Sequence, residues 1–191
     1  MKAFPIVLLI CAGSVQAWAQ GQITFGNRLR VAGIDAPVFD SDCTTRLAGA
    51  AYLAQVYAGR APDSLSPVGW VMPFRTGAQA GYITAVVITI PGTFQDDLVY
   101  TQLRAWEARA GASFEEAVAS GGKYGLSNIV PMRTVMPPGT PNEPVGLQSF
   151  CLVPEPPPGA LLALGGGLWL LAARRRPAPT RSSSRHANRG G

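Results

Sequence analysis

Apolar and polar residues alternate in several short runs along the middle of the chain, which is the pattern of half-buried β-strands. Strands are predicted over residues 22–27, 51–58, 82–90, 98–107, 126–132 and 145–153. The run 82–90 is the richest in β-branched side chains and stops at a Pro-Gly pair, which favours a central strand. Gly and Pro residues separate the other runs and indicate turns. The pattern therefore predicts an all-β fold, an antiparallel β-sandwich.

Two of these runs also predict which side chains share a face. In 51–58, Tyr57 falls on one side of the strand and Val56 on the other. In 98–107, the odd-numbered residues 99–105 fall opposite the even-numbered residues 100–106. The even-numbered side includes Arg104 and Trp106, for which a structural cation–π contact is expected.

One short helix is predicted between the fourth and fifth runs. Ser113 and Glu116 have the spacing of a capping box, in which the Ser hydroxyl caps the helix and the Glu occupies its third position. Alanine and valine continue the helix to residue 119, and Gly121 ends it. About two turns fit this length, so the helix is an addition to a sheet protein.

The N-terminus is typical of a secretory signal peptide over residues 1–19. A basic residue precedes an apolar run, and Ala17 and Ala19 fit the small-x-small cleavage pattern, so the mature chain is expected to begin at Gln20. The alternative is a lipoprotein signal that uses Cys11. Such a signal normally has a small residue before the cysteine, where this chain has an isoleucine.

The C-terminal part combines three features in a fixed order over residues 153–176. A rigid motif comes first, an uncharged apolar run over 159–173 follows, and a basic cluster ends the segment. The motif consists of Pro154, Glu155 and Pro156, and the cluster of Arg174, Arg175 and Arg176. In this order the three features resemble the PEP-CTERM sorting signal of exported bacterial proteins. The resemblance implies that an exosortase, a membrane transpeptidase-like enzyme, recognises the motif and cleaves near it.

The apolar run is expected to form a single hydrophobic helix in the inner membrane, with the arginines on the cytoplasmic side. Its 15 residues span roughly 22 Å, less than a bilayer core, and arginine side chains can extend to the interface to make up some of the length. The alternative is a buried helix of a soluble domain. Residues 177–191 are expected to be a basic, disordered tail whose arginines touch acidic lipids.

The predicted body, residues 20–152, also resembles a domain type found ahead of this sorting tail. The resemblance rests on five short motifs, Pro-Val-Phe-Asp (37–40), Leu-Ala-Gly to Tyr-Ala-Gly (47–59), Pro-Val-Gly (67–69), Arg-Ala-Trp (104–106) and Ser-Phe-Glu-Glu-Ala (113–117). It implies no enzymatic activity.

Charge and cysteine content fit export. The chain has a formal net charge of +5, but residues 20–153 hold nine basic and ten acidic side chains, a net charge of −1. The body therefore gives no support for nucleic-acid binding. After cleavage two cysteines remain, Cys43 and Cys151, which are candidates for one disulfide in an oxidising compartment. Two free thiols are the alternative.

The body has no histidine, because His186 lies in the tail. This excludes Ser-His-Asp and Cys-His catalysis and His-ligated zinc in the body, and no phosphate-binding or dinucleotide-binding motif is present. A carboxylate pair among Glu107, Glu115 and Glu116 could act as acid and base, although the last two also suit a helix start. No catalytic residue is assigned, and no cofactor is expected.

Two further groups of residues have both a binding and a structural interpretation. Asp35, Asp40 and Asp42 are candidate calcium ligands, but they lack the EF-hand pattern, and a polar turn is the favoured interpretation. Aromatic residues could line a sugar-binding face, although a place in the core is favoured. They are Tyr52, Tyr57, Trp70, Tyr100 and Trp106.

Together these features predict an exported, non-enzymatic structural protein of the cell surface or extracellular matrix. It is expected to be held at the inner membrane in transit, with an exosortase-type enzyme as a partner and exopolysaccharide as a candidate partner. The alternatives are a surface carbohydrate-binding module, which would use Trp70 or Trp106, and a secreted hydrolase, which would use Glu107.

Overall fold

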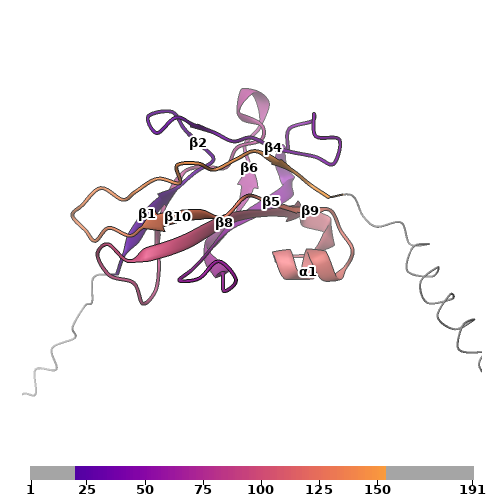
Figure 1. The fold of residues 1–191 in the computed structure, drawn as a ribbon. Coiled ribbons are helices and arrows are strands. Elements are labelled where there is room, and N and C mark those ends of the chain that lie inside the picture. Colours follow the sequence, from indigo (N-terminus) through magenta and orange to yellow (C-terminus); the bar gives the residue numbers. More distant parts are fainter. Residues whose placement is uncertain (1–19, 154–191) are drawn as a thin grey trace, which may run out of the picture. The chain divides into compact units, whose positions relative to one another are not determined.

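β-Strands dominate residues 20–153, the part of the chain that this computed structural model describes (Figure 1). Five of them form one antiparallel sheet in the order β10-β8-β5-β6, in which β9 and β10 pair with different halves of β8. They are β5 (Gly49–Gly59), β6 (Ser66–Phe74), β8 (Leu98–Glu107), β9 (Tyr124–Leu126) and β10 (Val130–Arg133).

Short two-stranded ribbons complete the β structure of the described residues. The first pairs β1 (Gln22–Phe25) with β7 (Val86–Thr89), and the second pairs β2 (Arg28–Leu29) with β3 (Ile34–Asp35), both antiparallel. The third pairs β4 (Val38–Phe39) with β11 (Phe150–Cys151) in parallel. Three short helices are also present, η1 (Gly77–Gln79), η2 (Ala108–Ala110) and α1 (Phe114–Ala119). The fold is therefore all-β with little helix, as the sequence predicts.

One face of the five-stranded sheet packs against the ribbons. Val56 of β5 and Leu103 of β8 are fully buried there, in one apolar cluster with Ile23 and Phe25 of β1 and Ile88 of β7. Residues of β8 with odd numbers from 99 to 105 all point to this side and are buried. The predicted division of faces on β5 and β8 is confirmed.

The opposite face is covered by α1, which lies on the other side of the sheet from β2 and β4 in Figure 1. Phe114 of α1 meets Tyr57 and Trp106 edge to face, with ring centroids 6.1 and 6.3 Å apart. Trp106 is fully buried, and its Nε1 donates a hydrogen bond to the carbonyl of Gly111 at 3.0 Å. The short helix is thus held to the sheet by aromatic packing rather than by its own length.

The predicted helix and its Ser113 cap are confirmed, and the second half of the capping box is shifted by one residue. Ser113 is the N-cap, and its hydroxyl accepts a hydrogen bond from the backbone N–H of Glu116 at 3.2 Å. The Glu116 carboxylate reaches back to the N–H of Ala112 at 2.8 Å, one residue before the position that a standard capping box would use.

The prediction of a central strand over 82–90 is wrong. Only Val86–Thr89 forms a strand, and it pairs with β1 in a two-stranded ribbon, while β5 and β8 occupy the interior of the main sheet. The start of this run does not pair with another strand, because the backbone N–H of Ile83 donates to the side-chain oxygen of Asn27 at 2.9 Å.

The late run 145–153 is also much shorter than predicted. Only Phe150 and Cys151 are in a strand, because Gly146 has a left-handed φ of 95° and the chain turns there. The run 126–132 divides similarly, with β9 ending at Leu126 and β10 beginning at Val130.

Prolines lie on the outermost strands of the main sheet. Pro131 is on β10, and Pro67 and Pro73 are on β6. Proline lacks a backbone N–H, so these positions offer no donor to a further strand.

Several predicted segments lie outside the described residues. They are the signal peptide over 1–19 with its cleavage residues Ala17 and Ala19, the motif residues 154–156, the hydrophobic segment 159–173, the arginines 174–176 and the tail 177–191. Between residues 20 and 153, no helix is long and apolar enough to cross a bilayer.

Candidate functional site

The two cysteines of the body form a disulfide. Cys43 lies in the turn after β4 and Cys151 ends β11, with their Cα atoms 5.2 Å apart and a sequence separation of 108. Two residues later, the N–H of Val153 donates to the carbonyl of Tyr124 at 2.6 Å. The C-terminal end of the body is therefore fastened both covalently and by the edge of the main sheet.

The three aspartates proposed as calcium ligands have separate partners. Asp40 accepts hydrogen bonds from Lys123 Nζ at 2.9 Å and from the Tyr52 hydroxyl at 2.9 Å. Asp42 accepts from the N–H groups of the two following threonines, and Asp35 accepts from a tyrosine hydroxyl. Among residues 20–153, no three His, Cys, Asp or Glu residues are placed to hold one metal ion. The structure does not bring the three aspartates together as one site.

These contacts set the acidity of the aspartates. Burial alone would raise the pKa of Asp40, but the hydrogen bonds from Lys123, Ser41 and Tyr52 together lower it below its ordinary value of 3.8. The hydrogen bond between Lys123 and Asp40 also raises the pKa of the Lys123 ammonium group. Hydrogen bonds from Thr45 and Thr44 lower the pKa of Asp42. Asp40 and Asp42 are thus held as structural anions.

The three glutamates considered as an acid–base pair are also engaged in the fold. Glu115 accepts the Tyr57 hydroxyl at 2.8 Å, and Glu116 is part of the helix cap. Glu107 Oε1 lies 2.7 Å from Arg109 Nε, while its Oε2 is buried without a hydrogen-bond partner among the described residues. Burial and the hydrogen bond to Glu115 raise the pKa of Tyr57. The geometry assigns these carboxylates to packing and capping.

The aromatic candidates divide between the core and the surface. Tyr57 and Trp106 are buried, as the favoured interpretation expects, so Trp106 is not available to stack on a sugar. Trp70 of β6 is 63% exposed, which corrects its expected place in the core. The predicted contact between Arg104 and Trp106 is also replaced, because the Arg104 guanidinium lies 4.0 Å from the ring centroid of Tyr57.

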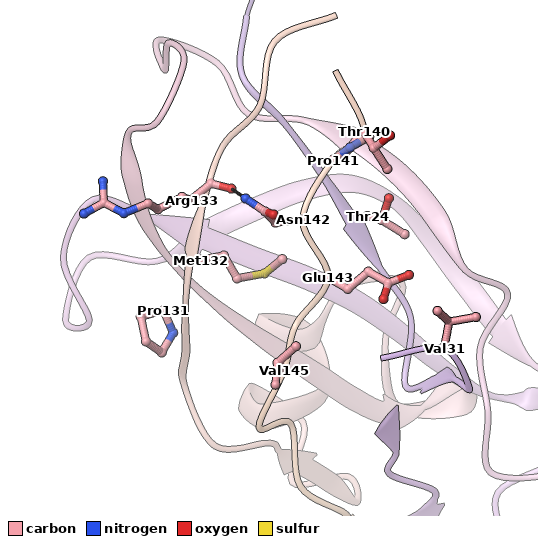
Figure 2. A pocket seen from close by; sticks show the side chains of 10 residues that line it. All are labelled: Thr24, Val31, Pro131, Met132, Arg133, Thr140, Pro141, Asn142, Glu143 and Val145. Carbon is pink, nitrogen blue, oxygen red and sulfur yellow. Dashed lines mark hydrogen bonds between the residues drawn. The ribbon is translucent and has the colours of Figure 1, made fainter. Parts of the chain in front are cut away.

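A wide, open groove of about 730 Å³ lies beside β10 (Figure 2). Met132 lies along its floor, and Asn142 closes one side by donating a hydrogen bond from Nδ2 to the carbonyl of Arg133 at 2.8 Å. In Figure 2 the Glu143 carboxylate points toward Val31, whereas the Arg133 guanidinium points away from the groove. The residues that line the groove offer a surface for binding, but they include no second acid or base beside Glu143.

A cluster of arginines lies around Tyr82, and no local pattern in the sequence predicts it. Arg28 and Arg46 lie over the buried Tyr82 ring, 4.8 and 5.4 Å from its centroid. Arg28 and Arg75 both donate to the side-chain oxygen of Gln79, at 3.0 and 3.5 Å. Net charge conceals this cluster because acidic residues elsewhere in the body balance it, and the arginines are far apart in sequence.

The described residues therefore present two surfaces with chemistry of their own, the groove beside β10 and the arginine cluster. Neither contains a nucleophile with an adjacent base, and the carboxylates that could act in catalysis have structural partners. Comparison of the chain with protein-family models, with curated proteins and with solved structures found no match.

Proposed function

We propose that the protein is an exported structural protein of the cell surface or extracellular matrix, sorted through residues 153–176. In this proposal an exosortase-type membrane enzyme recognises Pro154, Glu155 and Pro156, and the apolar run 159–173 holds the chain in the inner membrane as a helix until cleavage. The body is a non-catalytic β-sandwich that is antiparallel except for the ribbon of β4 and β11, and the ribbons of β1–β4, β7 and β11 serve as its second layer.

The observation that supports export most directly is the disulfide between Cys43 and Cys151. Disulfides persist in oxidising compartments and are rare in the cytosol of mesophiles. The bond lies three residues before Pro154, and the backbone hydrogen bond of Val153 follows it. A motif that starts where a fixed domain ends is well placed for an enzyme that must bind it without unfolding the body.

The proposal is tested by the intact mass of the protein from fractionated cells of its native host. A surface or matrix form that begins at Gln20 and ends near residues 154–156 is the expected result. Changing Pro154→Ala and Pro156→Ala together should leave the full-length mature chain in the inner membrane. The matched control, Pro157→Ala with Pro158→Ala, should still be sorted. A wild-type chain found only at full length in the inner membrane would show that the tail is a plain anchor.

A surface carbohydrate-binding module is the second candidate, and the exposure of Trp70 is the observation that favours it. An exposed indole ring can stack on the apolar face of a sugar. Loss of glycan-array binding in Trp70→Ala would support this candidate, and an unchanged array would count against it.

A further inference from the structure

Ion pairing divides the basic residues of the body into two groups. Five of the nine form salt bridges with carboxylates: Arg60 with Asp97, Arg104 with Glu115, Arg109 with Glu107, Lys123 with Asp40, and Arg133 with Asp96. Within residues 20–153, the other four arginines form none. These four are Arg28, Arg30, Arg46 and Arg75, and all except Arg28 are exposed. We call these four residues the arginine cluster. Arg28 contacts Tyr82 together with Arg46 and contacts Gln79 together with Arg75, and Arg30 lines two surface hollows together with Arg28.

A buried framework holds the cluster in place. Asn27 is fully buried, and its Nδ2 donates to the carbonyls of Ala36 and Gly81 at 2.9 and 2.8 Å. Its Oδ1 accepts the N–H of Ile83, so Asn27 fixes both neighbours of Tyr82 along the chain. The Tyr82 hydroxyl in turn donates to the Asp35 carboxylate. The backbone next to Arg28 and the ring beneath it are therefore ordered before any ligand binds.

This arrangement has an electrostatic cost. Guanidinium groups that share one acceptor or one ring repel each other, and Gln79 brings no negative charge to offset this. Asp35 is the carboxylate that faces the cluster, and it already accepts a hydrogen bond from Tyr82. Four arginines against one aspartate leave a local charge of +3 on a body whose net charge is −1. A fold that keeps such a local conflict usually does so at a functional site.

Two adjacent hollows lie within the cluster. One, of about 340 Å³, is lined by Arg28, Arg30 and Asp35, and the other, of about 290 Å³, by Arg28, Arg30, Arg75 and Gln79. Because the hollows share Arg28 and Arg30, two neighbouring anionic groups of one ligand can occupy them together. The planar guanidinium fork matches the geometry of a carboxylate or sulfate oxygen pair.

We propose that the arginine cluster binds an acidic polysaccharide, a chain whose sugars carry closely spaced carboxylates or sulfates. No aromatic ring lines either hollow, so the platform on which single-stranded nucleic acids stack their bases is missing there. Arg28 and Arg30 line both hollows, and their guanidinium groups suit the anionic groups of hydrated sugars better than lipid tails. This inference goes beyond the proposed function, because it concerns residues of the body and does not depend on sorting.

The test measures binding of the purified full chain to immobilised polygalacturonate, with neutral dextran as the reference. Binding to polygalacturonate alone is expected, and it should weaken as salt rises because exposed charges are screened over about 8 Å at physiological ionic strength. The double variant Arg30→Gln with Arg75→Gln should lose at least tenfold in affinity. Both side chains are exposed, so its thermal transition should match that of the wild type.

The matched control is Arg60→Gln with Arg133→Gln, which removes the same charge from two exposed, salt-bridged arginines. Its affinity should stay within twofold of wild type. Equal losses in the two double variants would overturn the proposal by showing attraction to net charge alone. An equal tenfold loss of binding to single-stranded DNA in the variant Arg30→Gln with Arg75→Gln would also overturn it, by showing that the cluster is a general anion surface.

Discussion

Removal of the disulfide is expected to cost much of the stability of the body. In the double variant Cys43→Ser with Cys151→Ser, the perturbation is chiefly the loss of a loop closure, since Cys43 is exposed and Cys151 is half-buried. The bond spans 108 residues of sequence. In the chain-entropy model a loop of this size corresponds to about 16 cal/mol/K, or about 4.8 kcal/mol at 25 °C. For a body of about 130 residues, this lowers Tm by about 17 °C.

The assay is urea unfolding of the oxidised full chain, followed by near-ultraviolet circular dichroism, which reports the buried Trp106. The same unfolding curve is measured for the double variant and for the wild type in reducing agent. Both should shift to lower urea by a similar amount, and intact mass should show two extra hydrogens in the reduced wild type. A loss below about 1 kcal/mol in the double variant would refute the reasoning, because loop closure would then contribute little.

Two further predictions concern single side chains. Asn27→Ala should lower the free energy of unfolding by about 3 kcal/mol, because it leaves three buried backbone groups without partners. The control Asn142→Ala, at an exposed position, should lower it by less than about 1 kcal/mol. Urea unfolding measures both changes. The lowered pKa of Asp40 contributes stability above pH 4 that is lost as the pH falls through its folded-state value. Asp40→Asn should therefore cost about 1 kcal/mol at pH 7 and progressively less as the pH falls below 4, and a cost that does not change with pH would contradict the ion pair with Lys123.

The sequence predicts those parts of the fold that depend on residues close together in the chain. The face assignments of β5 and β8 follow from strict alternation, and the start of α1 follows from Ser113 and Glu116 alone. The prediction for the run 82–90 is wrong because the pairing of this run depends on residues distant in sequence. Its β-branched side chains favour a strand, but Asn27 takes the N–H of Ile83, and β1 is the partner that remains.

The candidate sites show the same division between local and distant information. The local concentration of acidic residues favours a calcium site, yet Asp42 accepts hydrogen bonds within its own turn, whereas Asp40 and Asp35 accept them from residues distant in sequence. The arginine cluster has no local signal, since residues 28, 46 and 75 are far apart in sequence and come together only through Tyr82 and Gln79. Ion pairing, which sequence does not reveal, separates the four arginines of the cluster, Arg30 included, from the other five basic residues of the body.

The prolines on β6 and β10 have a consequence for how these molecules behave at high density. Many copies at one surface bring unpaired strand edges close together, and such edges are the usual starting point for intermolecular β-pairing and fibre growth. Pro131, Pro67 and Pro73 interrupt the row of donors that a neighbour would need. A dense layer of this protein is therefore expected to remain a collection of separate folded domains, and any cohesion in it must come from side chains or from a polymer between them.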